Sequence, residues 1–400
     1  MQEHRFVRPL GPLGPYAEDY RCRLVGLGYT FGSLQHRMTQ LSQVSRWLAA
    51  EGLAAADLDE EVALRFLAWR SGRGRKRWVS LGSIRLLLEF LRAAGVVEEA
   101  GGDGGPFGDV LGGYRRYLVE ERGLADKTVA GHLREAEEFL VVAAGERSAL
   151  AGLGGAQVRS YLVEVSRRKS TDCVQKAAGS VVSLLRYLHV SGVIDASLVW
   201  AVPKVASRRA RPQSPGLSAT EMAVLLSGCD RRRAVGRRDY AVLLLLGEMG
   251  LRACEVARLG LDDFDWRNGE VVVHGKGGRL DAMPVPARVG AAVAAYLRRD
   301  RPVLGGCRAV FLRSRAPLAP LGLAGVQAVV RDASRRAGMG MFGPRRLRHS
   351  AATRIHRGGT GLAVVAEVLR HRDIRVTAVY VDVDPAAVAE LARPWPGARS

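Results

Sequence analysis

Lysine and long apolar runs are both scarce in this 400-residue chain, in which only six of the 60 basic residues are lysines. No stretch approaches the roughly 20 apolar residues of a membrane span, and the opening sequence MQEHRFVRPL lacks the apolar run of a secretion signal. No two cysteines form a CxxC pair and no histidine stands at metal-ligand spacing, which predicts reduced thiols in a cytoplasmic protein. The five cysteines are Cys22, Cys173, Cys229, Cys254 and Cys307. We therefore expect a soluble protein with no membrane partner, no metal and no cofactor.

The charge that is present is strongly positive. Lys plus Arg number 60 against 40 Asp plus Glu, which gives a net charge of +20 and a pI near 10.5. So large an excess, spread over the whole chain, indicates a polyanionic partner, most simply double-stranded DNA. The alternative explanation is a GC-rich genome, which favours arginine codons. A DNA partner would associate this cytoplasmic protein with the nucleoid.

Two linkers divide the chain, which is too long for a single core. The first, Gly101–Pro106, is glycine-rich and would not be kept in a helix or strand. The second, residues 203–216, contains three prolines and several basic residues. It can extend along a phosphate backbone or serve as an ordinary solvated connection. The predicted domains are residues 1–100, 107–202 and 217–400.

The first two domains resemble each other. The segment Ser83–Val97 matches Ser180–Ile194, and aromatic pairs upstream recur at nearly the same offset. We interpret the N-terminal domain as a duplicate of the second. Apolar residues at helical spacing predict four helices in the second copy. These are expected near Val110–Glu121, Lys127–Ala144, Ala156–Arg168 and Thr171–His189.

The polar faces of these helices carry many cations. Taken alone, a charged helix face is more often exposed to solvent than in contact with DNA. A small helical bundle with this much positive charge beside a basic linker nevertheless favours DNA binding. The candidate DNA-binding residues are Arg115, Arg116, Lys127, Arg134, Arg167, Arg168, Lys169 and Lys176, with Lys204, Arg208, Arg209 and Arg211 of the linker.

The third domain opens with the sequence LSATE, a capping box that begins a helix at Leu217–Glu221. An apolar helix is expected over Asp239–Met249, and Gly250 interrupts it. Arg252 then begins another helix, with Glu255 three residues later and so on the same face.

Turn signals predict three short antiparallel strands next. Asn268-Gly269 joins the first two, and the glycine-rich run after His274 places Lys276 at the tip of the second hairpin. The sequence after Pro286 is expected to be helix and loop. The predicted fold class is therefore mainly α (α+β), with helical bundles and one small three-stranded sheet.

The ordered motifs of this domain resemble the tyrosine recombinase, or phage integrase, family. They are GLRACEVARL, the hairpin Lys276, RRLRHSAATRI, LRH and a tyrosine nine residues after that histidine. The resemblance covers residues 217–384, and residues 109–194 are similar to the family's core-binding, SAM-like domain. The C-terminal run also looks like the ends of recombinases carried by mobile elements. The resemblance implies a site-specific recombinase or integrase that serves DNA integration or transposition. It also implies a homo-tetramer on paired DNA sites, alone or with sister recombinases.

The resemblance also implies a set of catalytic roles. Tyr380 attacks the scissile phosphate and forms a 3′-phosphotyrosyl link, which conserves the bond energy needed for rejoining. Arg252 and Arg348 supply charged donors to the transition state. Lys276 protonates the departing 5′-oxygen, because guanidinium is too weak an acid to do so. His371 donates to a phosphate oxygen, and Glu255 buttresses Arg252.

Two positions depart from the family pattern. Arg345 stands three residues before Arg348, where the family usually has histidine, and Arg370 replaces the usual glycine before the later histidine. Arg345 can contact phosphate but cannot accept the Tyr380 proton, so the general base is left open between water, His349 and no residue. Two other function classes stay open: a type IB-like topoisomerase, and a DNA-binding accessory recombinase subunit with weakened catalysis.

Overall fold

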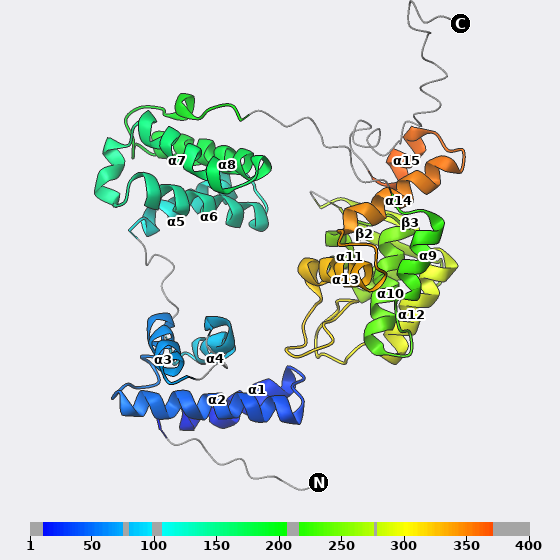
Figure 1. Ribbon diagram of the computed structural model, residues 1–400, viewed down its shortest axis with the longest axis horizontal. Coiled ribbons are helices and arrows are strands. Elements are labelled where there is room, and N and C mark those ends of the chain that lie inside the picture. The colour runs from blue at the N-terminus through cyan, green and yellow to red at the C-terminus, as the bar shows by residue number, and fades with distance from the viewer. Residues whose placement is uncertain (1–10, 75–79, 98–105, 206–215, 276–277, 371–400) are drawn as a thin grey trace, which may run out of the picture. The chain divides into compact units, whose positions relative to one another are not determined.

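The computed structural model describes residues 11–74, 80–97, 106–205, 216–275 and 278–370 (Figure 1). These residues are mostly helical with one three-stranded antiparallel sheet, so the expected fold class is confirmed. By its contacts the chain divides into two compact units, Met1–Pro15 with Leu41–Pro212 and Tyr16–Gln40 with Gln213–Ser400. The finer division into three domains stays a prediction. No described helix has the length and apolarity needed to cross a membrane.

Four helices are described in the N-terminal region, residues 11–97. The side chain of Asp59 caps the third by accepting a hydrogen bond from the backbone N–H of Val62 at 2.8 Å. Buried aromatic rings join the second and third helices, with the ring centroids of Trp47 and Phe66 5.5 Å apart. After the short 3₁₀ turn η1 (Gly14–Tyr16), the helices are α1 (Ala17–Gly26), α2 (Phe31–Ala50), α3 (Glu60–Gly72) and α4 (Leu81–Ala93).

The second helical group matches the four helices expected from the sequence. Its core contains the last helix's Val181, Leu184, Leu185 and Leu188, whose three- and four-residue spacing places them on one face. The elements are α5 (Gly108–Arg116), which continues as the π-helix η2 (Tyr117–Glu121), α6 (Asp126–Ala143), η3 (Arg147–Gly152), α7 (Gly155–Arg168), α8 (Thr171–Val190) and η4 (Val199–Ala201).

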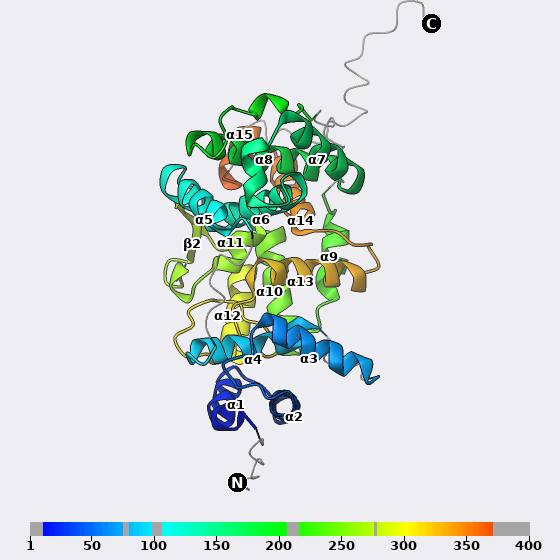
Figure 2. The same cartoon turned by 90° about the vertical axis from the view of Figure 1, so that its left-hand side faces the viewer.

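In residues 216–370, which we call the C-terminal unit, helices surround a central apolar helix, α10 (Figure 2). The expected capping box is confirmed, because Ser218 and Glu221 exchange hydrogen bonds at 3.1 and 2.7 Å. The elements are α9 (Ala219–Ser227), α10 (Ala234–Gly247), α11 (Ala253–Arg258), η5 (Leu261–Asp263), β1 (Phe264–Asp265), β2 (Glu270–His274), β3 (Leu280–Pro284), α12 (Ala287–Arg299), α13 (Gly322–Arg336), α14 (Pro344–Arg357) and α15 (Leu362–Val368).

Helix α10 begins five residues before the expected Asp239. Arg238 and Asp239 are both buried, and the Arg238 guanidinium donates to the Asp239 carboxylate at 2.7 Å and to the backbone oxygen of Leu312 at 3.1 Å. Because the two side chains form an ion pair, the cost of burying both charges in the core is partly compensated.

The three strands lie in sequence order, as expected. Strand β2 pairs with both neighbours, and its register to β3 includes Val271 with Met283 and His274 with Leu280. The backbone N–H of Gly275 donates to the carbonyl of Arg279 at 2.7 Å and closes the hairpin stem. The hairpin therefore leads directly into the loop that contains Lys276, which lies outside the described residues.

Candidate active site

The turn between α10 and α11 places Arg252. Gly250 has φ of +63°, and a Cβ atom there would lie 2.7 Å from the Leu369 Cδ2 atom. Both the backbone conformation and the close approach therefore require glycine. Arg252 follows as the N-cap residue of α11.

Glu255 holds Arg252 at two points. Its Oε1 atom accepts a hydrogen bond from the guanidinium at 2.7 Å, and its Oε2 atom accepts one from the Arg252 backbone N–H at 2.7 Å. The Glu255 side chain is 2% exposed, whereas that of Arg252 is 38% exposed. One side of the guanidinium is thus anchored to a buried carboxylate while the rest stays accessible to an anion.

Arg348 approaches the same turn from α14. Its buried guanidinium donates to the backbone oxygens of Gly250 and Leu369. The Arg252 guanidinium donates to the next carbonyl, that of Arg370, at 3.3 Å. The structure thus brings together two arginines that are far apart in the sequence, both bound to the chain just after α15.

Arg370 contributes a third guanidinium. Its side chain is 6% exposed and pairs with Glu255 at 2.5 Å and with Asp281 of β3 at 3.8 Å. Burial lowers the pKa of Arg370, and the attraction of Glu255 opposes that shift. Glu255 therefore lies between two arginines, and not beside Arg252 alone as the sequence indicated.

The other arginines of α14 differ in their surroundings. Arg345, in the first turn, is exposed and forms no ion pair with any described residue. His349 is 2% exposed. Arg354 donates to the backbone oxygens of Gly247 and Glu248 at 3.3 and 2.6 Å, and so satisfies the C-terminal carbonyls of α10. Sequence analysis missed Arg354 because its partners depend on how α14 packs.

Three expected catalytic residues, Lys276, His371 and Tyr380, lie outside the described residues. The chain is described on both sides of Lys276 and just before His371. The β2–β3 stem flanks Lys276, and Leu369 and Arg370 directly precede His371. The linker residues Arg208, Arg209 and Arg211 also lie beyond the described part.

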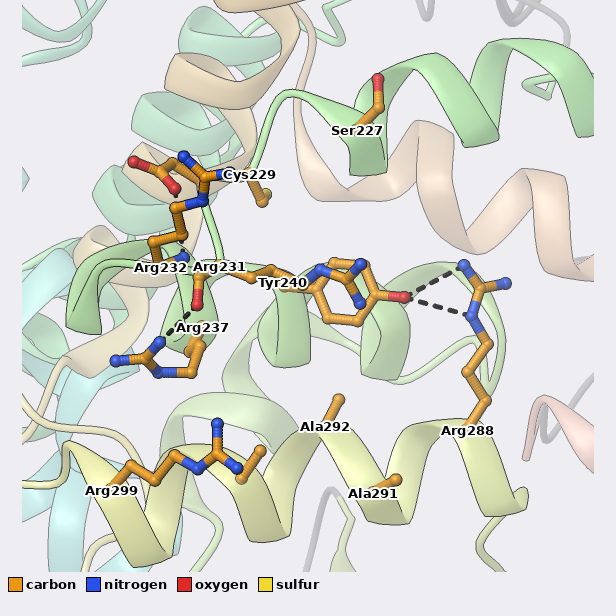
Figure 3. A pocket seen from close by; sticks show the side chains of 12 residues that line it. Ser227, Cys229, Arg231, Arg232, Arg237, Tyr240, Arg288, Ala291, Ala292 and Arg299 are labelled. Carbon is orange, nitrogen blue, oxygen red and sulfur yellow. Dashed lines mark hydrogen bonds between the residues drawn. The ribbon is translucent and has the colours of Figure 1, made fainter.

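Two cavities of the C-terminal unit differ in their relation to these arginines. One of about 600 Å³ is lined by β3, the end of α15 and Arg370. Another of about 710 Å³ is lined by five arginines and Tyr240 (Figure 3). In it Arg288 donates to the Tyr240 hydroxyl, and Arg231 lies 4.8 Å from the ring centroid. Neither cavity is lined by Arg252 or Arg348, and only the smaller one is lined by Arg370, so the arginine pair and not a cavity marks the candidate site.

Most predicted DNA-binding cations of the second helical group are exposed. Two are engaged with acids of the same group: Lys169 pairs with Glu138 at 2.8 Å, and Arg168 pairs with Glu164. The others form no ion pair with a described residue. They are Arg115, Arg116, Lys127, Arg134, Arg167 and Lys176, and Lys204 of the linker also forms none.

Solved structures of DNA-bound recombinases share this fold. A lambda integrase dimer bound to a COC′ core site superposes with a TM-score of 0.53 at 16% identity, over 72% of this chain and 96% of that one. The XerH site-specific recombinase bound to palindromic difH gives a TM-score of 0.52 at 18% identity, over 73% of this chain and 97% of that one.

Sequence relatives define the family more closely. Residues 216–387 match the model of the phage integrase family. A putative integrase/recombinase, y4rA of Sinorhizobium fredii, is 34% identical over 97% of this chain and 96% of its own. The tyrosine recombinase XerD of Mycobacterium tuberculosis is 32% identical over 72% of this chain and 96% of its own. The chain belongs to the phage integrase family of tyrosine recombinases, enzymes of site-specific recombination.

Proposed function

We propose that this recombinase cleaves and rejoins DNA through a 3′-phosphotyrosyl intermediate with Tyr380 as nucleophile. The observation that carries the proposal is the convergence of Arg252 and Arg348 on the backbone just before His371. Two permanent positive charges from different helices, one partly exposed, suit a phosphodiester whose non-bridging oxygens gain charge in the transition state.

The remaining roles follow from proton balance. Tyr380 loses a proton as its oxygen bonds to phosphorus, and the departing 5′-oxygen gains one as its bond to phosphorus breaks. Lys276 supplies the second proton, because the arginines cannot give one up at neutral pH. His371 donates to a non-bridging oxygen. The 5′-hydroxyl of a partner strand then attacks the phosphotyrosine and restores the diester.

Arg345 contacts the phosphate in this proposal. It is exposed in the first turn of α14, one turn before Arg348, and no described residue neutralises it. A fixed charge there stabilises the transition state and lowers the pKa of an approaching phenol, which partly replaces a missing general base.

A nicked suicide substrate tests the cleavage step. The full-length protein should form a covalent complex with the 3′ end of the DNA, and the Tyr380→Phe variant should form none while its DNA affinity stays nearly unchanged. Covalent complex that persists in the variant would remove Tyr380 from its role. Joining of the cleaved strand to a second duplex supports strand exchange. Relaxation of supercoiled DNA without joining would favour the topoisomerase alternative. DNA binding without cleavage would favour the accessory subunit.

The DNA-contact surface extends the proposal to the second helical group and the linker. We assign double-stranded recombination sites as substrate, and residues 107–202 and 203–216 as the regions that follow the phosphate backbone. Replacing a cation that pairs with no described residue, such as Arg134, should reduce the salt dependence of binding by about one counterion per contact. Arg168 should have a smaller effect, because Glu164 already pairs with it. An equal effect of both would contradict the assignment.

Assembly and biological setting complete the proposal. We assign a homo-tetramer on two DNA sites, alone or with sister recombinases, in integration or transposition of a mobile element at the nucleoid. The residues after Tyr380 include Val388, Leu391 and Ala392, which we assign to packing on a neighbouring protomer. Deleting residues from Ala386 onward should weaken pairing of two sites more than binding to one; equal loss of both would show that the tail belongs to its own fold.

A further inference from the structure

The backbone at Arg370 adopts a conformation that suits glycine. Its φ of +57° is the one positive value at a non-glycine among the described residues. A left-handed arginine is strained, and such strain persists only where surrounding contacts hold it. At Arg370 these contacts are made by its own side chain. They explain how the strained backbone is held in place, but not what the arginine contributes that glycine would not.

The Arg370 side chain joins two elements that carry different catalytic groups. It pairs with Glu255, the carboxylate that holds Arg252. It also pairs with Asp281 and donates to the Met283 sulfur, both on β3. Strand β3 leads back through Arg279 to the loop of Lys276, so one guanidinium connects the phosphate-binding arginine with the hairpin of the expected acid.

Stability alone gives a weak reason for such a cluster. Burying several charges costs desolvation free energy, and apolar side chains of similar size often stabilise the folded protein as well or better. A buried, charge-paired cluster does, however, fix relative positions, because the hydrogen bond from Arg370 to Glu255 is directional and removing one partner of a buried ion pair, such as that of Arg370 with Asp281, is costly. The observed geometry therefore favours a positioning role over a purely stabilising one.

We propose that Arg370 is a positioning residue that fixes the β2–β3 hairpin against Glu255 and thereby aligns the general acid with the Arg252-bound phosphate. This proposal rests on the proposed function, in which Lys276 protonates the 5′-oxygen. It differs from a contact with DNA, because the Arg370 guanidinium is buried and both its carboxylate partners belong to the protein.

The test compares two leaving groups in single-turnover cleavage of the suicide substrate. Arg370→Gly removes the side chain and suits the backbone, so the protein should stay folded. On the ordinary 5′-oxygen substrate its rate should fall roughly tenfold to hundredfold, a part of the factor that general acid catalysis supplies. On a 5′-bridging phosphorothiolate, whose sulfur leaves without protonation, the rate should stay close to that of the unaltered protein.

Matched variants separate the outcomes. Lys276→Ala should be rescued by sulfur in the same way, and the double variant should be little slower than Lys276→Ala alone, because both act on one step. Arg308→Ala serves as control, since its ion pair with Asp262 is exposed and lies outside the site. Asp281→Asn, which keeps the backbone unaltered, should show the same oxygen-specific loss. Because Asp281 also accepts a hydrogen bond from Arg279 at 2.7 Å, Arg279→Ala is its control and should keep its rate; this pair decides the matter if Arg370→Gly does not fold.

Equal loss on both substrates, or no loss on either, overturns the positioning role. Rescue of Lys276→Ala without rescue of Arg370→Gly overturns this proposal alone. A Lys276→Ala variant that sulfur does not rescue overturns the acid assignment, and the alignment role of Arg370 with it. Absence of any covalent complex with Tyr380 refutes the proposed function itself.

Discussion

Arg252 and Arg348 donate hydrogen bonds to two consecutive backbone carbonyls, those of Arg370 and Leu369. Arg252 is the N-cap residue of α11, Arg348 lies in α14, and the carbonyls belong to the chain that follows α15. The alignment of the pair therefore depends on a shared piece of backbone. Changes that move this backbone should affect both arginines together.

Glu255→Gln tests the shared carboxylate. The substitution keeps the shape but removes the charge between Arg252 and Arg370, so both guanidinium groups lose an ion pair. We expect a loss of about 1 to 3 kcal/mol in the free energy of unfolding and at least a tenfold slower cleavage. Urea denaturation and single-turnover cleavage measure the two effects. Glu270→Gln, at an exposed position of β2, is the control, and equal behaviour of the two variants would contradict a special role for Glu255.

Gly250→Ala tests the turn itself. Positive φ costs a non-glycine residue about 1 to 2 kcal/mol, and at Gly250 the new methyl group would also meet Leu369. Gly269→Ala is a matched control, because its φ is +68° and no atom lies within 4 Å of the added carbon. We expect Gly250→Ala to lose more thermal stability and most cleavage activity, and Gly269→Ala to keep its activity. Equal activity in both would mean that the turn does not govern the arginine pair.

Arg345→His introduces the residue that the family resemblance predicts at this position. We expect cleavage to persist and its rate to rise with pH through a new titration near 6.5, the usual histidine pKa, because the neutral ring accepts the Tyr380 proton. The pH–rate profile of single-turnover cleavage measures this. Loss of activity in Arg345→His with retention in Arg345→Lys would show that only the charge matters. No change in either variant would place Arg345 outside the site.

The capping box at the start of α9 makes a prediction about stability and pH. The backbone N–H of Ser218, then its side chain and Arg346, lower the pKa of Glu221. A lowered carboxyl pKa stabilises the folded state above the unfolded value, about 4.3, and this contribution is lost as pH falls through the folded pKa. Glu221→Gln should therefore reduce the loss of stability on acidification below about pH 4. Urea midpoints between pH 7 and pH 3 measure it, and an unchanged acid profile would contradict it.

Ser218→Ala isolates the other half of the same cap. The variant removes the hydroxyl that accepts from the Glu221 backbone N–H and should cost about 1 kcal/mol at neutral pH. The urea midpoint of the full-length protein is the measurement. Ser227→Ala, at the exposed last residue of α9, is the control. A Ser218→Ala variant as stable as this control would show that the cap contributes little.

The amino-acid sequence by itself determined the local elements. Apolar spacing located α5 to α8, the LSATE motif located the start of α9, and glycine-rich turns located the hairpin, because each pattern acts over a few neighbouring residues. The ordered motifs also singled out Arg252 and Arg348. The early start of α10 was missed because the pairing of Arg238 with Asp239 allows charged residues at buried positions, and apolar spacing alone does not reveal it.

Tertiary structure alone decided which groups meet. The sequence marked Arg370 as a departure and Glu255 as a neighbour of Arg252, yet nothing local connects either residue to Asp281. Arg370 reaches both Glu255 and Asp281 because the end of α15 packs on the Gly250 turn and beside β3, which brings residues about a hundred positions apart within ion-pairing distance. A buried charge without a partner is costly, so buried charges pair with whichever opposite charges the packed elements bring close. Their pairing therefore follows from the packing of whole elements and not from spacing along the chain.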